Sequence, residues 1–244
     1  MTRPFYLGVG GVVSADIAVP EHEREVAFYS KVLTTGEHPL WRDDLMNNQG
    51  TPIIGLGQRV PEYESLPLQW TPHFQVADIA ASAARAVELG GKELFHGKDD
   101  DGNSLWAALV DPAGGAFGII PVVDEEAYAV PDLSDVGCIA GLALVAADVG
   151  AMSAFYEQVI GLESSSIDGD GRCELRRPDG SAAAEICPAA DGLPSAWILS
   201  LPVRDFDASL RHVRDGCGVV VREDAGARTA VIQDPVGVFI GLQG

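Results

Sequence analysis

Short segments with alternating apolar and polar residues recur along the chain, and segments with a helical pattern separate them. The first run leads from Ser14, Asp16 and Ala18, which share one face of a predicted strand, into a predicted helix from about residue 21 to 33. Three short extended pieces follow, near residues 38–42, 45–48 and 52–56. The pattern predicts a strand–helix–strand–strand–strand module.

A second module of the same kind follows a proline-containing connector. Asp78 stands where a helix N-cap is expected, before an alanine-rich segment that ends at Gly90 and Gly91. Three more strands are predicted near residues 93–96, 105–110 and 116–121. A shift of 57 residues carries Asp16 onto His73 (73 − 16 = 57), and both strands lead into a helix.

The second half of the chain repeats the first. Phe28-Tyr29 aligns with Phe155-Tyr156 at an offset of 155 − 28 = 127 residues, and Trp70 and Asp78 align with Trp197 and Asp205 at the same offset. Asp111-Pro112 aligns with Asp234-Pro235 at 234 − 111 = 123, so the second copy has four residues fewer in a loop. A register kept this long indicates a duplication. We expect a first domain at 1–122, a linker at 123–135 and a second domain at 136–244, each holding two modules.

Composition narrows the class of protein. The 244 residues are 47% hydrophobic, enough for buried cores in two domains, but no run approaches the ~20 apolar residues of a membrane span. The four cysteines form no C-x-x-C motif, which favours reduced thiols in a cytoplasmic protein. A formal net charge of −20 disfavours nucleic acid and anionic membranes as partners.

Six motifs in this order resemble the vicinal oxygen chelate superfamily, which includes glyoxalase I, bleomycin-resistance proteins and extradiol dioxygenases. The motifs cover nearly the whole chain: Val26–Tyr29, Trp70–Asp78, Asp111–Gly114, Ala154–Tyr156, Trp197–Asp205 and Asp234–Gly237. The resemblance implies an α+β fold in which four βαβββ modules pair into two domains. It also implies that the mixed sheets form cups that hold the ligand.

Metal-using members of this superfamily place a histidine or similar ligand early in the first strand of a module and a glutamate in the last strand. In the first half, these positions carry Ser14 and Thr71 in the first strands, Gly118 in one last strand, and a residue near Ile54 in the other. In the second half, they carry Gly141, Ile198 and Gly241, with Glu185 near the remaining position. One carboxylate does not make a catalytic zinc or iron site. No cofactor is therefore expected.

If Ser14 and Thr71 face the cup of the first domain, Asp16 and His73 face it too, because side chains alternate along a strand. A carboxylate beside an imidazole could make a general base, could hold a polar ligand, or could be a structural pair. Trp70 and Trp106 are further candidates for lining the cup, and core packing is the alternative for each. Ala143 and Ser200 take the places of the pair in the second half, which predicts one site per chain.

These observations favour a metal-independent protein of the bleomycin-resistance type that binds an apolar aromatic or cationic small molecule in the first cup. The alternative is an enzyme of the same superfamily, a lyase, isomerase or dioxygenase. Such an enzyme would use Asp16 and His73 or a divalent metal held by unexpected residues. A monomer or a homodimer is expected, because duplication already supplies the module pairs.

Overall fold

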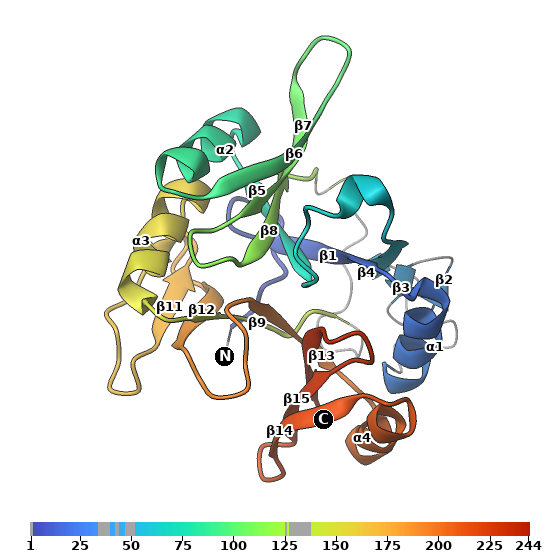
Figure 1. Ribbon diagram of the computed structural model, residues 1–244. Coiled ribbons are helices and arrows are strands. Elements are labelled where there is room, and N and C mark those ends of the chain that lie inside the picture. The colour runs from blue at the N-terminus through green and yellow to red at the C-terminus, as the bar shows by residue number, and fades with distance from the viewer. Residues whose placement is uncertain (1, 34–39, 42–43, 47–51, 125, 127–137) are drawn as a thin grey trace. The chain divides into compact units, whose positions relative to one another are not determined.

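The computed structural model describes residues 2–33, 40–41, 44–46, 52–124, 126 and 138–244 (Figure 1). Within these residues the helices are α1 His22–Val32, α2 Ile79–Glu88, α3 Val149–Ile160 and α4 Phe206–Asp215, with a 3-10 turn at Pro61–Tyr63. The strands of the first half are β1 Val12–Val19, β2 Leu40–Trp41, β3 Asp44–Met46, β4 Pro52–Gln58, β5 Thr71–Val76, β6 Lys92–Lys98, β7 Ser104–Val110 and β8 Ala116–Pro121. Those of the second half are β9 Gly141–Ala146, β10 Glu163–Ser164, β11 Cys173–Arg176, β12 Ala182–Pro188, β13 Trp197–Pro202, β14 Val219–Asp224, β15 Thr229–Gln233 and β16 Phe239–Gln243.

All four modules share one topology. The first strand of a module pairs in parallel with its last strand, as β5 does with β8, and the other pairs within each module are antiparallel. The strand orders are β2-β3-β4-β1, β5-β8-β7-β6, β10-β11-β12-β9 and β13-β16-β15-β14. The predicted class, α+β with four βαβββ modules and mixed sheets, is confirmed.

Helix starts follow the residues that the sequence provides. Asp78, Asp148 and Asp205 each accept a hydrogen bond of 2.9 Å from a backbone N–H three residues further on, so each is an N-cap. Gly90 has a φ of +91°, which suits the left-handed end of α2. Helix α1 differs, because Glu21 at its start makes no side-chain cap.

One compact unit comprises Met1–Val13, Thr71–Tyr128 and Gly141–Trp197. In it, α2 and α3 lie side by side, and α2 covers one face of β6, β7 and β8 (Figure 1). At the centre, the Tyr156 hydroxyl donates a 2.8 Å hydrogen bond to Asp111 Oδ2 and accepts one of 2.9 Å from Trp197 Nε1. All three side chains are buried, so their hydrogen bonds stabilise this core.

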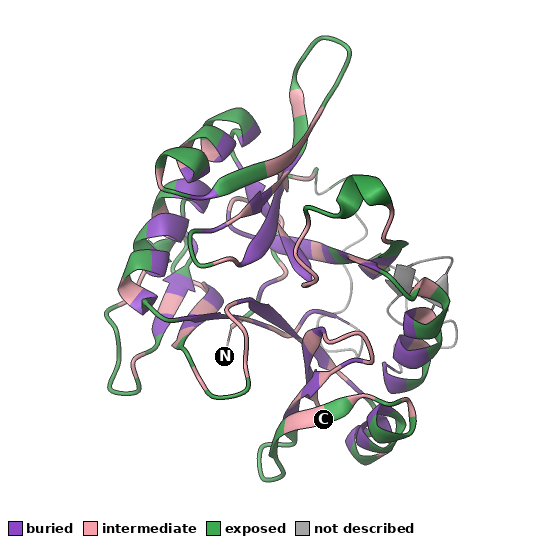
Figure 2. Cartoon of the chain, in the orientation of Figure 1, coloured by how far each residue is buried: buried purple, intermediate pink, exposed green. Residues whose placement is uncertain are grey.

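The other compact unit comprises Ser14–Trp70, Ala129–Ala140 and Ile198–Gly244. In it, α1 and α4 lie side by side (Figure 1), and each has a buried and an exposed side (Figure 2). Ser209 Oγ donates a 2.7 Å hydrogen bond to the Val32 carbonyl. The Tyr29 hydroxyl donates a 2.8 Å hydrogen bond to Asp234 Oδ2. The Trp70 ring packs edge-on against Tyr29 with centroids 5.6 Å apart.

Each unit contains one module from each half of the chain, because a helix of the first half packs against a helix of the second half. The predicted domain boundaries at 122 and 136 follow chain order and stay a prediction. Most of the predicted linker, 123–135, lies outside the described residues. In the part of the chain that is described, no helix is both long and apolar enough to cross a bilayer.

Replacing Tyr156 by phenylalanine should lower the free energy of unfolding by about 1–3 kcal/mol. The change removes a donor from buried Asp111 and the acceptor of the Trp197 indole N–H, and leaves both groups buried. Urea unfolding followed by tryptophan fluorescence measures the effect. Tyr63→Phe is the matched control on an exposed side chain, with an expected change of about 0.5 kcal/mol or less. Equal losses in the two variants would contradict the role assigned to Tyr156.

Candidate functional site

The sheet of β5–β8 has two faces of opposite character. One face carries Phe74, Leu109 and Phe117, which are buried on the side that α2 covers. By strand alternation the other face carries His73, Ala108 and Gly118. The register confirms this grouping, since Gly118 is paired with His73 on β5 and with Ala108 on β7.

The imidazole of His73 lies over Gly118. A Cβ atom built on Gly118 would come within 2.6 Å of His73 Cδ2, so any larger residue at position 118 would displace the ring. His73 is half-buried, whereas Gly118 is buried beneath it. The glycine therefore creates the place that the imidazole occupies.

A second aromatic ring uses a glycine in the same way. Trp106 on β7 is paired with Gly97 on β6, and a Cβ atom on Gly97 would overlap the indole ring. The indole thus lies across Gly97, and Trp106 remains 43% exposed. An aromatic side chain this exposed, on a supported platform, can stack against a ligand.

Between the two rings the surface is apolar. Phe95 is paired with Ala108, and both are half-buried. We call the surface formed by His73, Phe95, Gly97, Ala108, Trp106 and Gly118 the His73–Trp106 face. It lies within one unit and combines one titratable ring with apolar contact area.

The sequence predicted His73 and Trp106 as site residues and Gly118 as a position for a metal ligand in the family, but it did not predict Phe95, Gly97 or Ala108. Pairing across a hairpin could have found them. The turn at Asp99–Asn103, where the backbone N–H of Asp99 donates to the Asn103 carbonyl, sets the register that places Gly97 opposite Trp106.

A divalent metal does not fit the residues of this face. Thr71, at the family's first ligand position, offers a neutral hydroxyl and is buried. Gly118, at the second ligand position, has no side chain, and the His73 ring fills the space that a carboxylate would need. Among the described residues, no group of three or more His, Cys, Asp or Glu side chains is arranged to hold a metal ion. Catalytic zinc and non-haem iron sites need three protein ligands.

The other candidates from the first half, Ser14, Asp16 and Trp70, lie in the second unit. Ser14 is half-buried and Asp16 is exposed on β1, where Asp16 is paired with Gly55. The pairing of Asp16 with Gly55 corresponds to the pairing of His73 with Gly118 in the next module. The family's ligand position that was expected near Ile54 is therefore Gly55. Trp70 is fully buried against Tyr29 and therefore serves core packing. The pairing of Asp16 with His73 stays a prediction.

The residue pairs equivalent to Asp16–Gly55 and His73–Gly118 recur in the second half with different side chains. Ala143 is paired with Glu185, and Ser200 with Gly241. Glu185 is engaged with Arg172, whose Nη1 lies 3.4 Å from Glu185 Oε2. Neither pair carries an imidazole.

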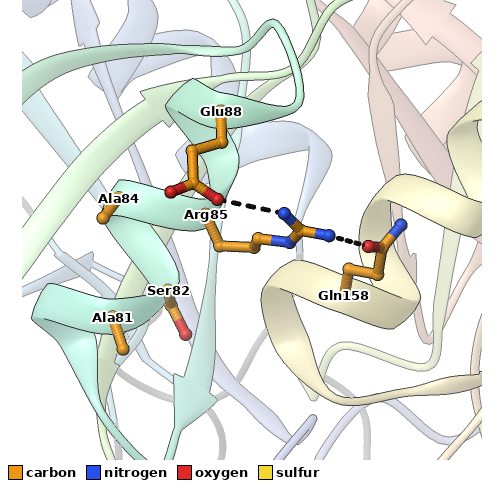
Figure 3. Close-up of a pocket in the computed structure, with 6 residues that line it drawn as sticks. All are labelled: Ala81, Ser82, Ala84, Arg85, Glu88 and Gln158. Carbon is orange, nitrogen blue, oxygen red and sulfur yellow. Dashed lines mark hydrogen bonds and ion pairs between the residues drawn. The ribbon is translucent and has the colours of Figure 1, made fainter.

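A hollow of about 430 Å³ lies between α2 and α3 (Figure 3), and no residue of the His73–Trp106 face lines it. Arg85 reaches across it from α2 to Gln158 on α3 and pairs with Glu88 at 3.0 Å. The remaining lining consists of Ala81, Ser82 and Ala84. Its one cationic group is already paired with a carboxylate, so this hollow is a weaker candidate than the sheet face.

The four βαβββ modules give this chain the fold of the vicinal oxygen chelate superfamily, and comparison with known proteins confirms the predicted resemblance. Residues 13–120 match the model of the glyoxalase-like domain family. A protein of Mycobacterium bovis called CFP32, provisionally named a glyoxylase, is 25% identical over 186 residues, which is 73% of this chain and 70% of that protein. The CFP32 protein of Mycobacterium tuberculosis matches with the same figures.

Solved structures share the fold over nearly the whole chain. The crystal structure of a Mn(II)-bound glyoxalase from Novosphingobium aromaticivorans has a TM-score of 0.59 at 15% identity, covering 96% of this chain and 81% of that one. A homoprotocatechuate 2,3-dioxygenase variant from B. fuscum has a TM-score of 0.60 at 13% identity, with coverage of 96% and 70%. The catechol dioxygenase BphC has a TM-score of 0.59 at 11% identity, with coverage of 98% and 87%.

Replacing Gly118 by alanine should move the His73 ring and cost about 1–3 kcal/mol of stability, because the added methyl group overlaps the imidazole. The imidazole proton resonances of His73, followed by NMR, report the displacement directly. Gly169→Ala is the control, because nothing lies within 4 Å of a Cβ built there. Unchanged His73 resonances in Gly118→Ala would show that the ring does not rest on this glycine.

Proposed function

We propose that this protein is a metal-independent small-molecule-binding protein whose ligand is a planar aromatic compound, neutral or cationic. The ligand stacks on the His73–Trp106 face. The observation that carries the proposal is the Trp106 indole, which lies over Gly97 while 43% of the residue stays exposed. Its support on the strand fixes the ring before a ligand arrives, which lowers the entropic cost of binding.

The surroundings of Trp106 favour a flat ligand. At Ala108 and Gly118 little or no side chain projects from the sheet, and Phe95 adds apolar area beside them. Stacked aromatic pairs contribute about 0.5–1.5 kcal/mol beyond the area that they bury. The His73 ring provides one polar contact that can orient the ligand.

The formal net charge of −20 favours ligands that carry a positive charge. A negative surface raises the local concentration of cations and repels anions. A cation placed over the face of an indole is attracted further, by about 0.5–2 kcal/mol. Among planar ligands of equal size, the cationic one should bind more tightly.

A metal-dependent reaction of the kind suggested by the names of the glyoxalase and dioxygenase neighbours would need ligands other than those at the family positions. Thr71 and Gly118 do not supply them. A second candidate is proton transfer by His73 in a lyase or isomerase, since its half-buried imidazole stands on the same surface as Trp106. Turnover of a bound compound that is lost in His73→Gln would favour this candidate.

Titration with N-methylacridinium and with neutral acridine, followed by quenching of tryptophan fluorescence, tests the proposal. Trp106→Ala should weaken binding of both compounds by about tenfold, or ~1.4 kcal/mol, since the stacking surface is lost. Isothermal titration calorimetry measures this variant, because the variant lacks one of the reporting indoles. Leu105→Ala is the matched control, as Leu105 is the adjacent exposed residue on the opposite face of β7. Equal affinities of Trp106→Ala and the unsubstituted protein would contradict the site.

Removal of metals separates binding from metal chemistry. Dialysis against EDTA should leave the affinity for N-methylacridinium unchanged, because Thr71 and Gly118 provide no carboxylate or imidazole ligand. Dialysis against Mn²⁺ or Zn²⁺, followed by elemental analysis, should give far less than one metal ion per chain. A stoichiometric metal that is required for ligand binding would contradict the proposed function.

A further inference from the structure

Glu25 on α1 is a buried acid without a conventional partner. Its relative exposure is 0%, and neither of its carboxyl oxygens has a hydrogen-bond partner of good geometry among the described residues. An ionised carboxylate that is buried without donors is costly, whereas the protonated acid is neutral and far cheaper to bury. This position therefore favours the protonated form.

Glu25 lies one helical turn before Tyr29 on the buried side of α1, and the Tyr29 hydroxyl bonds Asp234, so the acid beside Glu25 is Asp234, which already has its donors. Asp234 follows β15 and accepts hydrogen bonds from the Tyr29 hydroxyl at 2.8 Å, the Val238 N–H at 2.7 Å and the Val236 N–H at 3.1 Å. Three donors stabilise the negative charge on Asp234. Of the two acids, Asp234 is suited to carry the charge and Glu25 to carry the proton.

The other titratable and charged groups around Glu25 do not neutralise it. On α1 these are Arg24, Tyr29 and His22, with Glu21 preceding the helix; Arg24 pairs with Glu21 at 2.8 Å, and His22 Nε2 contacts the Leu56 carbonyl of β4. In the loop after α4, Cys217 lies near Arg24. The buried face of α4 consists of Phe206, Ser209, Leu210 and Val213, and the β4 segment has no ionisable side chain.

The other three modules have no acid at the helix position equivalent to Glu25. The offset of 127 residues carries Glu25 onto Met152 (25 + 127 = 152), and the shift of 57 carries it onto Ser82 (25 + 57 = 82). Ser82 in turn aligns with Ser209 (82 + 127 = 209). The aspartate that bonds the core tyrosine of the other unit, Asp111, thus has no equivalent acid beside it on α3.

We propose that Glu25 and Asp234 share one proton that locks α1 onto the loop after β15, so that loss of this proton releases α1 from its unit. Without the proton, two buried carboxylates face one another. Their repulsion acts on the same Asp234 that bonds Tyr29. The inference does not depend on the ligand proposed above, because it concerns the other compact unit.

Burial and the charge of Asp234 raise the pKa of Glu25 to about 8. In the open state the side chain returns to an ordinary glutamate pKa of about 4.3. The closed state thus holds its proton more tightly than the open state does. Its stabilisation is complete below the ordinary pKa, declines as the pH rises, and is lost above about 8.

Hydrogen exchange tests the lock. Protection factors of the α1 amides, corrected for intrinsic exchange rates, should fall by about tenfold per pH unit between about pH 5 and pH 8, the dependence expected for one proton. The amides of α3 are the internal control, because Met152 replaces the acid there. Equal pH dependence of α1 and α3 would overturn the proposal.

Glu25→Gln should abolish the pH dependence of protection at α1, because the amide cannot ionise, while the histidines of the unit are unchanged. Glu25→Met copies the residue of α3 and provides a second variant if the first does not fold. If the α1 slope persists in either folded variant, Glu25 is not the switch. A ¹³C titration of the Glu25 carboxyl in the unsubstituted protein gives an independent reading. A midpoint near the ordinary value for glutamate would refute the shared proton.

Discussion

The fold depends on two buried hydrogen bonds between a tyrosine and an aspartate. Tyr156 donates to Asp111 in one unit and Tyr29 donates to Asp234 in the other, both at 2.8 Å. Each bond joins the helix of one module to the loop before the last strand of another module. Burial raises the pKa of Asp111 and of Asp234, but donors from the loop backbone and from the tyrosine favour their charged forms. The motifs that revealed the duplication are therefore the residues that hold the modules together.

The sequence was sufficient for the features that depend on neighbours along the chain. Strand alternation, the aspartate N-caps and the repeat register predicted the four modules, because these are local signals. The partner of Tyr29 was beyond that reasoning, since Asp234 lies 205 residues away. Glu25 was missed for a related reason: an acid in the first turn of a helix normally faces solvent, and only tertiary packing buries it.

The candidate site was only partly predictable. Strand alternation on β5 identified His73. The surface between the His73 and Trp106 rings, from which few side chains project, depends on which residues are paired across β6, β7 and β8. Two glycines shape that surface, Gly118 under the imidazole and Gly97 under the indole. Position 118 has no side chain, and this leaves room for the imidazole of His73 to lie over the strand.

The interleaving of modules has a consequence for synthesis on the ribosome. Tyr29 of α1 is translated 205 residues before Asp234, to which it bonds. The unit that contains α1 cannot be completed until β16 has left the exit tunnel. The modules of the other unit are contiguous in translation order, from β5 to β12, and can join sooner. Of the four described α-helices, α1 is made first and waits longest for the helix beside it.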